Sequence, residues 1–183
     1  MHLDEKTKDS SVVYDGKIFK IKKDTVILED NSEAVREFVV HHGGVCVLPL
    51  TENNEILMVK QYRYPLGEAT LEVPAGKLNG PGEDHFEAGK RELLEETGAA
   101  AENIEYLGEI YPIPAYTTEI IHMYLARGLS FSSQNLDEDE FLDVVRIPFE
   151  EALKMVMDGT IKDSKTMIII MKAWIMLSGE GDK

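Results

Sequence analysis

The chain has 183 residues, of which 43% are apolar and 29% charged, and its formal net charge is −15. This length and composition predict one domain, or one domain with a small appendage, around a real core. The negative charge argues against nonspecific binding to nucleic acid or anionic membranes, because both need basic patches. The single Cys46 and the polar residues 1–10, which do not form a signal peptide, predict a cytoplasmic protein.

Short strands are expected in the first forty residues. Residues 1–10 are predicted to be a frayed tail. Residues 12–29 and 35–40 hold apolar residues among lysines around short turns, which is typical of a small antiparallel β meander. So small a segment cannot bury a core of its own, and we expect it to pack on the rest of the chain or on a second copy. We therefore divide the chain into an N-terminal β segment, 1–42, and a main domain, 43–183.

Strands and helices alternate in the main domain. Residues 45–50 form an apolar run suited to a strand buried on both faces, and 55–60 return after a turn. Residues 69–75 lead into a glycine-rich loop, 76–82, and a helix follows. Later strands are predicted at 104–110, 118–125 and 144–147, and helices at 149–158 and 164–177. The fold class is thus α/β or α+β.

The helix after the glycine-rich loop has clear ends. Asp84, with Glu87 three residues later, resembles a capping box, and Gly98 lies where a left-handed residue ends a helix. Between these ends, Glu92 and Glu96 are four residues apart and therefore share one helical face.

Glu95 joins Glu92 and Glu96 on that face. Like charges at these spacings cost roughly 0.2–0.5 kcal/mol per pair. One interpretation is an acidic surface helix in which Arg91 pairs with Glu87 or Glu95. The other is that a hard divalent cation such as Mg²⁺, which prefers oxygen ligands, holds the carboxylates together.

The spacing resembles the signature of the Nudix hydrolases, G-x5-E-x7-R-E-U-x-E-E-x-G-U, where U is apolar. Glu83, seven further residues and then R-E-L-L-E-E-T-G-A at 91–99 match it, although six residues rather than five separate Gly76 from Glu83. The resemblance implies a mixed β-sheet sandwiched between helices. It also implies two or three Mg²⁺ ions, or Mn²⁺ in their place, held by Glu92, Glu96, the neighbouring Glu95 and the Ala75 carbonyl oxygen.

A second set of motifs narrows the resemblance. Q-Y-R-Y-P at 61–65, L-E-V-P-A-G at 71–76 and Pro114, fifteen residues after Ala99, are similar to the ADP-ribose pyrophosphatase branch of this family. A guanidinium at Arg63 can grip a phosphate or pair with an acid. The resemblance implies that it contacts the diphosphate. The other predicted substrate-binding residues are Arg36, Glu72 and Pro114.

The acidic run at 137–140 has two interpretations. Such runs are usually solvated turns. In the ADP-ribose pyrophosphatases, a mobile loop at this place carries the catalytic Glu. Glu138 and Glu140 both fit that position; the sequence does not choose between them, and we favour Glu140. With Glu96, these are the predicted catalytic residues.

The predicted function is Mg²⁺-dependent hydrolysis of the diphosphate bond of ADP-ribose to AMP and ribose 5-phosphate. The alternatives are a Nudix pyrophosphatase for another nucleotide sugar, and a catalytically silent regulator that binds nucleotide sugars. A calcium-binding helix is disfavoured, because the alternating Asp/Asn loop of such sites is missing. We expect a homodimer in which the N-terminal meander packs on the other subunit, and no nucleic-acid or membrane partner.

Overall fold

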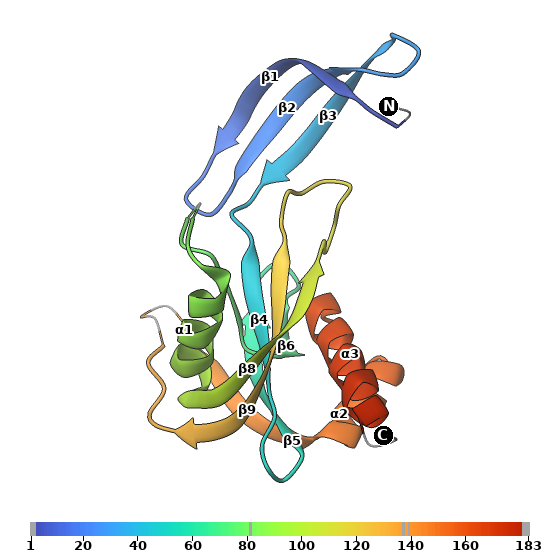
Figure 1. Cartoon of the computed structure of the whole chain (residues 1–183). Helices are drawn as coiled ribbons and strands as arrows, with labels where there is room; N and C mark the ends of the chain where they lie inside the picture. The colour runs from blue at the N-terminus through green and yellow to red at the C-terminus, as the bar shows by residue number, and fades with distance from the viewer. Residues whose placement is uncertain (1–2, 81, 137, 139, 181–183) are drawn as a thin grey trace. The chain divides into compact units, whose positions relative to one another are not determined.

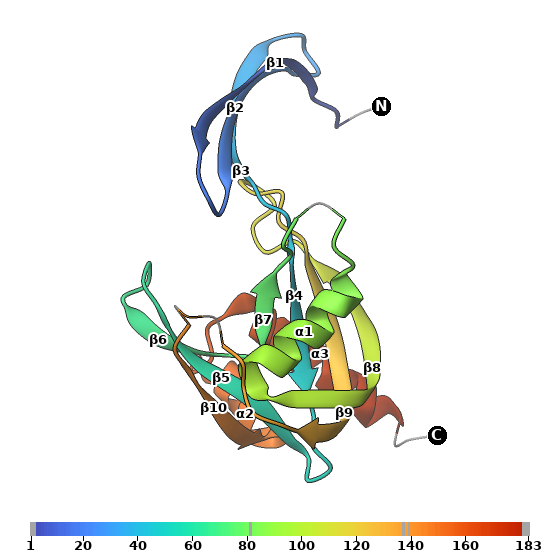
Figure 2. The same ribbon diagram turned by 90° about the vertical axis from the view of Figure 1, so that its left-hand side faces the viewer.

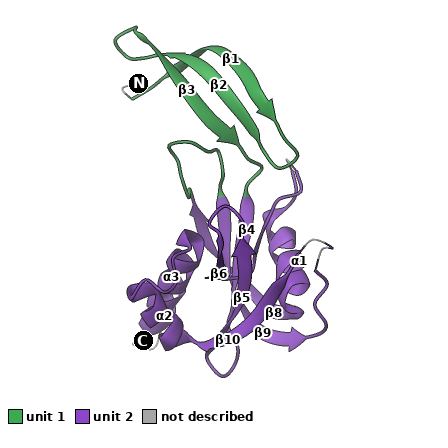
Figure 3. Ribbon diagram, turned by 180° about the vertical axis from the view of Figure 1, so that it is seen from behind, with its two compact units in different colours: residues 1–43, 111–120 green, residues 44–110, 121–183 purple. Residues whose placement is uncertain are grey.

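The computed structural model describes residues 3–80, 82–136, 138 and 140–180. The chain divides into two compact units, coloured in Figure 3: unit 1 is Met1–Gly43 and Tyr111–Ile120, and unit 2 is Gly44–Ile110 and Ile121–Lys183. The strands of unit 1 are β1 (Lys6–Asp15), β2 (Lys20–Ile27) and β3 (Glu33–Val40). The elements of unit 2 are β4 (Gly44–Pro49), β5 (Glu55–Arg63), β6 (Glu68–Glu72), β7 (Ala75–Lys77), α1 (His85–Thr97), β8 (Ala99–Ile110), β9 (Ile121–Phe131), β10 (Leu142–Pro148), α2 (Phe149–Met157) and α3 (Ser164–Glu180).

Unit 1 is an antiparallel sheet in the order β1-β2-β3, as the meander predicted. The expectation of a frayed tail through residue 10 is wrong, because β1 already starts at Lys6 and pairs with β2 from there. Backbone hydrogen bonds hold an edge strand without any help from apolar side chains, and all ten residues of β1 are exposed. Residues 111–120 join this unit through Val39, whose N–H donates to Tyr116 O at 2.7 Å.

Unit 2 contains a mixed sheet between helices. Its strand order is β7-β4-β9-β8, with β4 and β9 parallel and the other pairs antiparallel. A second, antiparallel sheet has the order β10-β5-β6. Figures 1 and 2 show α1 on one side of these sheets and α2 with α3 on the other. This confirms the predicted α+β class.

The central strand β4 is buried along its whole length, as its apolar run predicted. Its side chains alternate between two clusters. Cys46 and Leu48 pack with Ile169, Ile170 and other residues of α2 and α3. Val47 packs on the opposite side, in a second cluster that includes Leu93 of α1. Both helical layers are therefore fixed to the same strand.

Several strands differ in length from the prediction. β8 starts at Ala99, five residues earlier than expected, and β9 runs on to Phe131. The extra residues are mostly polar or small, but they pair with one another across an antiparallel ladder. The glycine-rich loop also begins later, because Ala75–Lys77 pairs with β4. Within the described ranges, no helix is long and apolar enough to cross a membrane.

Candidate active site

Helix α1 carries the signature, and both of its ends are as predicted. The Asp84 carboxylate accepts hydrogen bonds from the backbone N–H groups of Phe86 and Glu87, at 2.9 and 3.0 Å. Gly98 adopts a left-handed conformation with φ of 69° and donates its N–H to Leu94 O at 2.8 Å. These caps set where the helix begins and ends, and therefore which residues face the sheet.

The face of α1 that carries Glu92 and Glu96 is buried. The two residues are only 8% and 2% exposed. The backbone of β7 lies directly against both carboxylates: Ala75 N–H donates to Glu96 Oε2 at 3.0 Å, and a Cβ on Gly76 would lie 2.0 Å from the Glu92 carboxyl carbon. An acidic surface helix would leave these side chains in water, so the structure does not support that interpretation.

Burial gives the two carboxylates unusual acidities. Burial, together with the charges of Glu92 and Glu140, raises the pKa of Glu96 to about 8, although the Ala75 N–H and the Arg63 charge act to lower it. Burial also raises the pKa of Glu92, against the opposing effect of Arg91. Carboxylates held this close to one another fit a divalent cation, whose charge would stabilise their ionised forms.

Protein side chains alone would not complete such a metal site. Among the described residues, no three His, Cys, Asp or Glu side chains converge to hold an ion. The predicted donor set, the Glu92 and Glu96 carboxylates with the Ala75 carbonyl oxygen, would therefore need water molecules to complete it, as Mg²⁺ sites commonly do.

Arg91 ties the signature carboxylates together. Its Nη1 donates to Glu92 Oε1 at 2.7 Å and to Glu95 Oε2 at 2.9 Å, and its Nη2 donates to Glu83 Oε1 at 3.4 Å. Glu87 is not its partner and pairs with Lys90 instead. Arg91 thus holds the Glu92 carboxylate in place.

Arg63 and Glu72, which were predicted separately, form one bidentate ion pair. Arg63 Nε and Nη2 donate to Glu72 Oε1 and Oε2, each at 2.7 Å. Burial alone would raise the pKa of Glu72, but the hydrogen bond from Arg63, the Lys165 charge and the Thr70 hydroxyl lower it to about 2. Arg63 also lies near enough to Glu96 for each to shift the pKa of the other toward its charged form.

Sequence reasoning missed Lys165, which contacts Glu72 from the first turn of α3. The two residues are 93 positions apart, and no spacing in the sequence links them. A local signal near Lys165 is Asp163, a typical capping residue just before α3, whose carboxylate accepts the Thr166 N–H at 3.0 Å.

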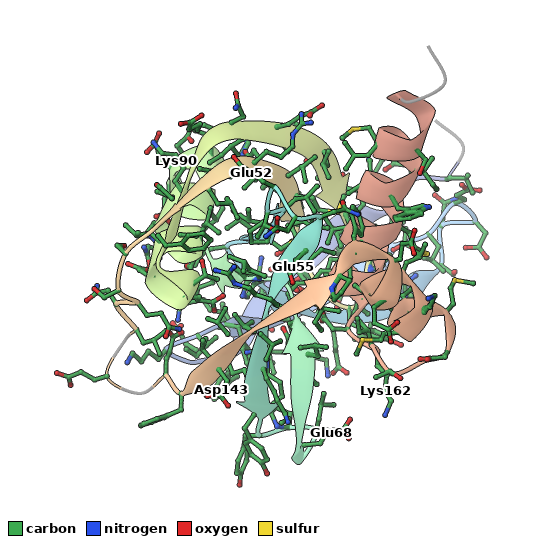
Figure 4. The ribbon with its side chains drawn as sticks, turned by 90° about the horizontal axis from the view of Figure 1, so that it is seen from below. Glu52, Glu55, Glu68, Lys90, Asp143 and Lys162 are labelled. Carbon is green, nitrogen blue, oxygen red and sulfur yellow. The ribbon has the colours of Figure 1, made fainter. Side chains whose placement is uncertain are left out.

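The acidic run after β9 has two described glutamates. Glu138 is exposed, whereas Glu140 is half-buried and its charge raises the pKa of both Glu92 and Glu96. Residues 137 and 139 lie outside the described part of the chain. Glu140 also lines a pocket of about 380 Å³ at the start of β10. Asp143, which lines the same pocket, is labelled in Figure 4. The lining residues are Lys60, Tyr62, Ala69, Leu136, Glu140, Phe141, Leu142 and Asp143.

Two predicted substrate-binding residues belong to unit 1. Arg36 is exposed and donates through Nε and Nη2 to the Glu5 carboxylate, at 2.9 and 2.5 Å. Pro114 is exposed in a turn of the 111–120 segment. Their role in binding substrate remains a prediction from the sequence.

Comparison with known proteins places these features in a family. The family model of the NUDIX domain matches residues 40–167. The chain is 41% identical over 169 residues to a methanol dehydrogenase activator from Bacillus methanolicus, covering 91% of each chain. It is 39% identical over 170 residues to an ADP-ribose pyrophosphatase from Bacillus subtilis (strain 168), covering 92% of this chain and 91% of the relative. The fold matches a crystal structure of an ADP compounds hydrolase with a TM-score of 0.86 at 21% identity, covering 97% of this chain and 96% of that one.

The family model covers more than half of the chain, and the relatives match over nearly all of it. The pyrophosphatases of this family use a divalent metal ion, which agrees with the buried carboxylates under β7. The chain therefore belongs to the Nudix family of pyrophosphohydrolases.

Proposed function

We propose that the protein hydrolyses the diphosphate bond of ADP-ribose to AMP and ribose 5-phosphate, with two or three Mg²⁺ ions, or Mn²⁺ in their place. The observation that carries this proposal is the buried pair Glu92 and Glu96 under the Ala75–Gly76 backbone, with the Arg63 guanidinium nearby. The ADP-ribose pyrophosphatase among the relatives supports the choice of substrate.

The metal would be held by Glu92, Glu96 and the Ala75 carbonyl oxygen, with Glu95 beside them. When bound, it neutralises diphosphate oxygens and makes a water molecule more acidic. Arg91 keeps the Glu92 carboxylate in place for this role. In a chain with a net charge of −15, such local positive charge is what allows an anionic substrate to bind.

Arg63 grips the diphosphate, and Glu140 acts as the base. The water oxygen attacks one phosphorus, the bridging P–O bond breaks, and the proton of the water passes to the Glu140 carboxylate. The half-buried position of Glu140 near Glu92 and Glu96 supports its role as the base. Glu138 is exposed, which argues against the same role for Glu138.

The substrate assignment is tested by comparing kcat/KM for ADP-ribose, ADP-glucose, GDP-mannose and a dinucleoside polyphosphate. We expect ADP-ribose to be preferred. A competitor that exceeds it about tenfold, equivalent to ~1.4 kcal/mol of transition-state preference, would show that the substrate is a different nucleotide derivative.

The metal assignment is tested in the same assay. Glu96→Gln keeps the shape of the side chain and removes its charge, so turnover should fall by about two orders of magnitude or more with the fold retained. Glu87→Gln, on the exposed face of the same helix, is the matched control and should be as active as the wild type. Near-normal turnover in Glu96→Gln would refute the assignment.

The most similar relative named above supports a second candidate, regulation of a dehydrogenase. Assaying a methanol dehydrogenase with and without the protein tests this. If the protein regulates the dehydrogenase only by binding a nucleotide, the Glu96→Gln variant should still activate the dehydrogenase. Loss of activation in that variant would tie regulation to hydrolysis.

We also propose that the protein is a homodimer, in which the sheet of unit 1 is covered by a second copy. This three-stranded sheet has apolar side chains on both faces that are about half exposed, and so small a sheet is not stable in isolation. Arg36 and Pro114, both in unit 1, would complete the substrate pocket of the pair. The exposed apolar residues on the strands of this sheet are Val12, Val13, Tyr14 and Val35.

A further inference from the structure

A nearly buried ammonium group lies beside the phosphate-binding arginine. The side chain of Lys165 is only 13% exposed, and its Nζ contacts Glu72 Oε2 and Asp163 Oδ2, the latter at 3.0 Å. Lysine is rarely buried unless its charge is paired, and the signature motif does not include this residue. Its position therefore calls for a role.

Glu72 is surrounded by donors on both oxygens. Oε1 accepts from Arg63 Nε at 2.7 Å and from Thr70 Oγ1 at 2.6 Å, while Oε2 accepts from Arg63 Nη2 at 2.7 Å and from Lys165. One carboxylate thus lies between two cations. The Asp163 charge is in turn shared with the start of α3, because its Oδ2 also accepts from the N–H and the hydroxyl of Thr166.

The same contacts fix α3 against the strand that leads into the active site. Thr166 is fully buried, and its hydroxyl accepts the Val73 N–H at 3.0 Å. Val73 follows Glu72 and lies two residues before Ala75, which contacts Glu96. These hydrogen bonds therefore fix the position of Lys165 relative to Glu72 and to the β7 backbone.

A substrate phosphate has to compete with Glu72 for Arg63. Within the described residues, Arg63 uses Nε and Nη2 on Glu72, and Nη1 has no hydrogen-bond partner. If Arg63 were the only cation at Glu72, the two charges would cancel, and the guanidinium would attract a diphosphate only weakly. Lys165 adds a second cation, but it also pairs with Asp163. The four side chains therefore sum to zero charge with Lys165 and to −1 without it, and a net negative charge at Arg63 would repel a diphosphate.

We propose that Lys165 is a positioning residue for substrate binding: by sharing Glu72 with Arg63, it holds the guanidinium in place and prevents the carboxylates around it from repelling the diphosphate. This inference rests on the proposed function, in which Arg63 grips the diphosphate. It predicts an effect on substrate affinity and little effect on the chemical step.

The test compares Lys165→Met and Lys165→Arg with Lys162→Met as a matched control. Lys162 precedes the same helix and pairs with a glutamate of the same strand, Glu68, at 3.8 Å, but it is exposed; both residues are labelled in Figure 4. Lys165→Met should raise KM for ADP-ribose and Kd for ADP in the presence of Mg²⁺ by about tenfold or more, with kcat within about threefold. Lys165→Arg should recover most of the affinity, and Lys162→Met should match the wild type.

A double-mutant cycle shows whether Lys165 acts through Arg63. In an Arg63→Ala background, Lys165→Met should change the Kd for ADP no further. Equal effects in both backgrounds would overturn the proposal, as would a Lys165→Met variant with lower thermal stability but unchanged KM and Kd. If Lys165→Met does not fold, Lys165→Gln replaces it with the same expectations.

Binding of ADP separates this proposal from the proposed function. If the wild type binds ADP but does not hydrolyse ADP-ribose, the substrate assignment fails, and the double-mutant cycle in Kd still decides the role of Lys165. If the wild type binds no ADP in the presence of Mg²⁺, the role of Lys165 is overturned as well.

Discussion

At the scale of single residues, Gly76 makes room for a carboxylate. A Cβ there would lie 2.0 Å from the Glu92 carboxyl group, which is the end of a flexible side chain and can move away. Gly76→Ala should therefore leave the fold stable to within about 1 kcal/mol but displace Glu92, lowering kcat/KM by about 100-fold or more. Turnover and the melting temperature, measured on the same preparation, check both parts.

Gly80→Ala is the matched control for Gly76→Ala. It lies four residues later, in the loop that follows β7, and a Cβ at Gly80 would meet nothing within 4 Å. It should be as active as the wild type. A fully active Gly76→Ala variant would mean that the position of the Glu92 carboxylate does not matter for turnover.

Glu72 should make stability depend on pH. Its pKa is about 2 in the folded protein and ~4.3 when unfolded, so its ionised form favours folding. This contribution, about 3 kcal/mol, is present above pH ~4.3 and is lost as the pH falls from there toward 2. Urea unfolding of Glu72→Gln and the wild type should therefore show a difference at pH 7 that shrinks at pH 3.

The control for Glu72→Gln is Glu105→Gln, which removes one partner of an exposed ion pair with Arg127. Exposed pairs contribute little, so its stability should follow the wild type at every pH. A difference between Glu72→Gln and the wild type that stayed constant from pH 7 to pH 3 would contradict the pH dependence expected of Glu72.

Local spacing predicts some residues of the site and not others. Asp84, Gly98 and the shared face of Glu92 and Glu96 follow from helical periodicity and capping, which are properties of adjacent residues. The pairing of Lys165 with Glu72 joins residues 93 positions apart, and it depends on where α3 docks. Such contacts are consequences of tertiary packing, which periodicity does not encode.

At the scale of elements, the end of α1 is joined to the connector that follows β9. Ser132 N–H donates to Gly98 O at 2.7 Å, and Asn135 N–H donates to Glu95 O at 3.0 Å. The Gln134 side chain donates to Glu96 O at 2.5 Å. Carbonyl groups at a helix end need such partners. The connector that leads toward Glu140 is thus anchored on the helix that carries Glu96.

Gly98→Ala should disrupt this junction. Its φ is 69°, and a Cβ would lie 2.4 Å from Ser132 O, a backbone atom that cannot easily move. The combined strain and clash should lower the free energy of unfolding by roughly 2–5 kcal/mol. Gly159→Ala is the control, because φ there is also positive, at 81°, but its Cβ would have open space. Equal losses in urea unfolding would show that the Ser132 contact is unimportant.

The order and type of the elements in unit 2 could be predicted, but the strand ends could not. The apolar run of β4 and the caps of α1 are strong local signals. The first half of β8 consists mostly of small or polar residues, many of them exposed, and it is a strand because β9 lies beside it. An edge strand of this kind takes its length from its partner.

At the scale of the whole molecule, the sheet of unit 1 is the feature that needs a partner. We expect a dimer of twice the 20.6 kDa chain mass at micromolar concentration, measured by light scattering. Val13→Lys places a charge on an exposed apolar position that is 57% accessible in one chain, so it should favour the monomer without disturbing the fold. Ser10→Lys, a polar and exposed position of the same strand, should remain dimeric.

The two variants differ only in whether an apolar contact is lost. A wild-type monomer that is fully active at micromolar concentration would refute the dimer.

The sequence predicted a small meander without a core of its own, because its apolar residues are few and spread among lysines. It did not predict that residues 111–120 belong to the same unit, since that pairing depends on Val39 meeting Tyr116 and Thr118.

The divided course of unit 1 has a consequence for how the chain is made. Its three strands are synthesised before unit 2, but the segment that bonds to β3 is synthesised only after all of β4 to β8. Unit 1 therefore cannot finish folding as an independent N-terminal piece. A nascent chain stopped before residue 111 would lack the Tyr116 and Thr118 contacts of Val39, and its exposed strands would have to wait for the rest of the protein.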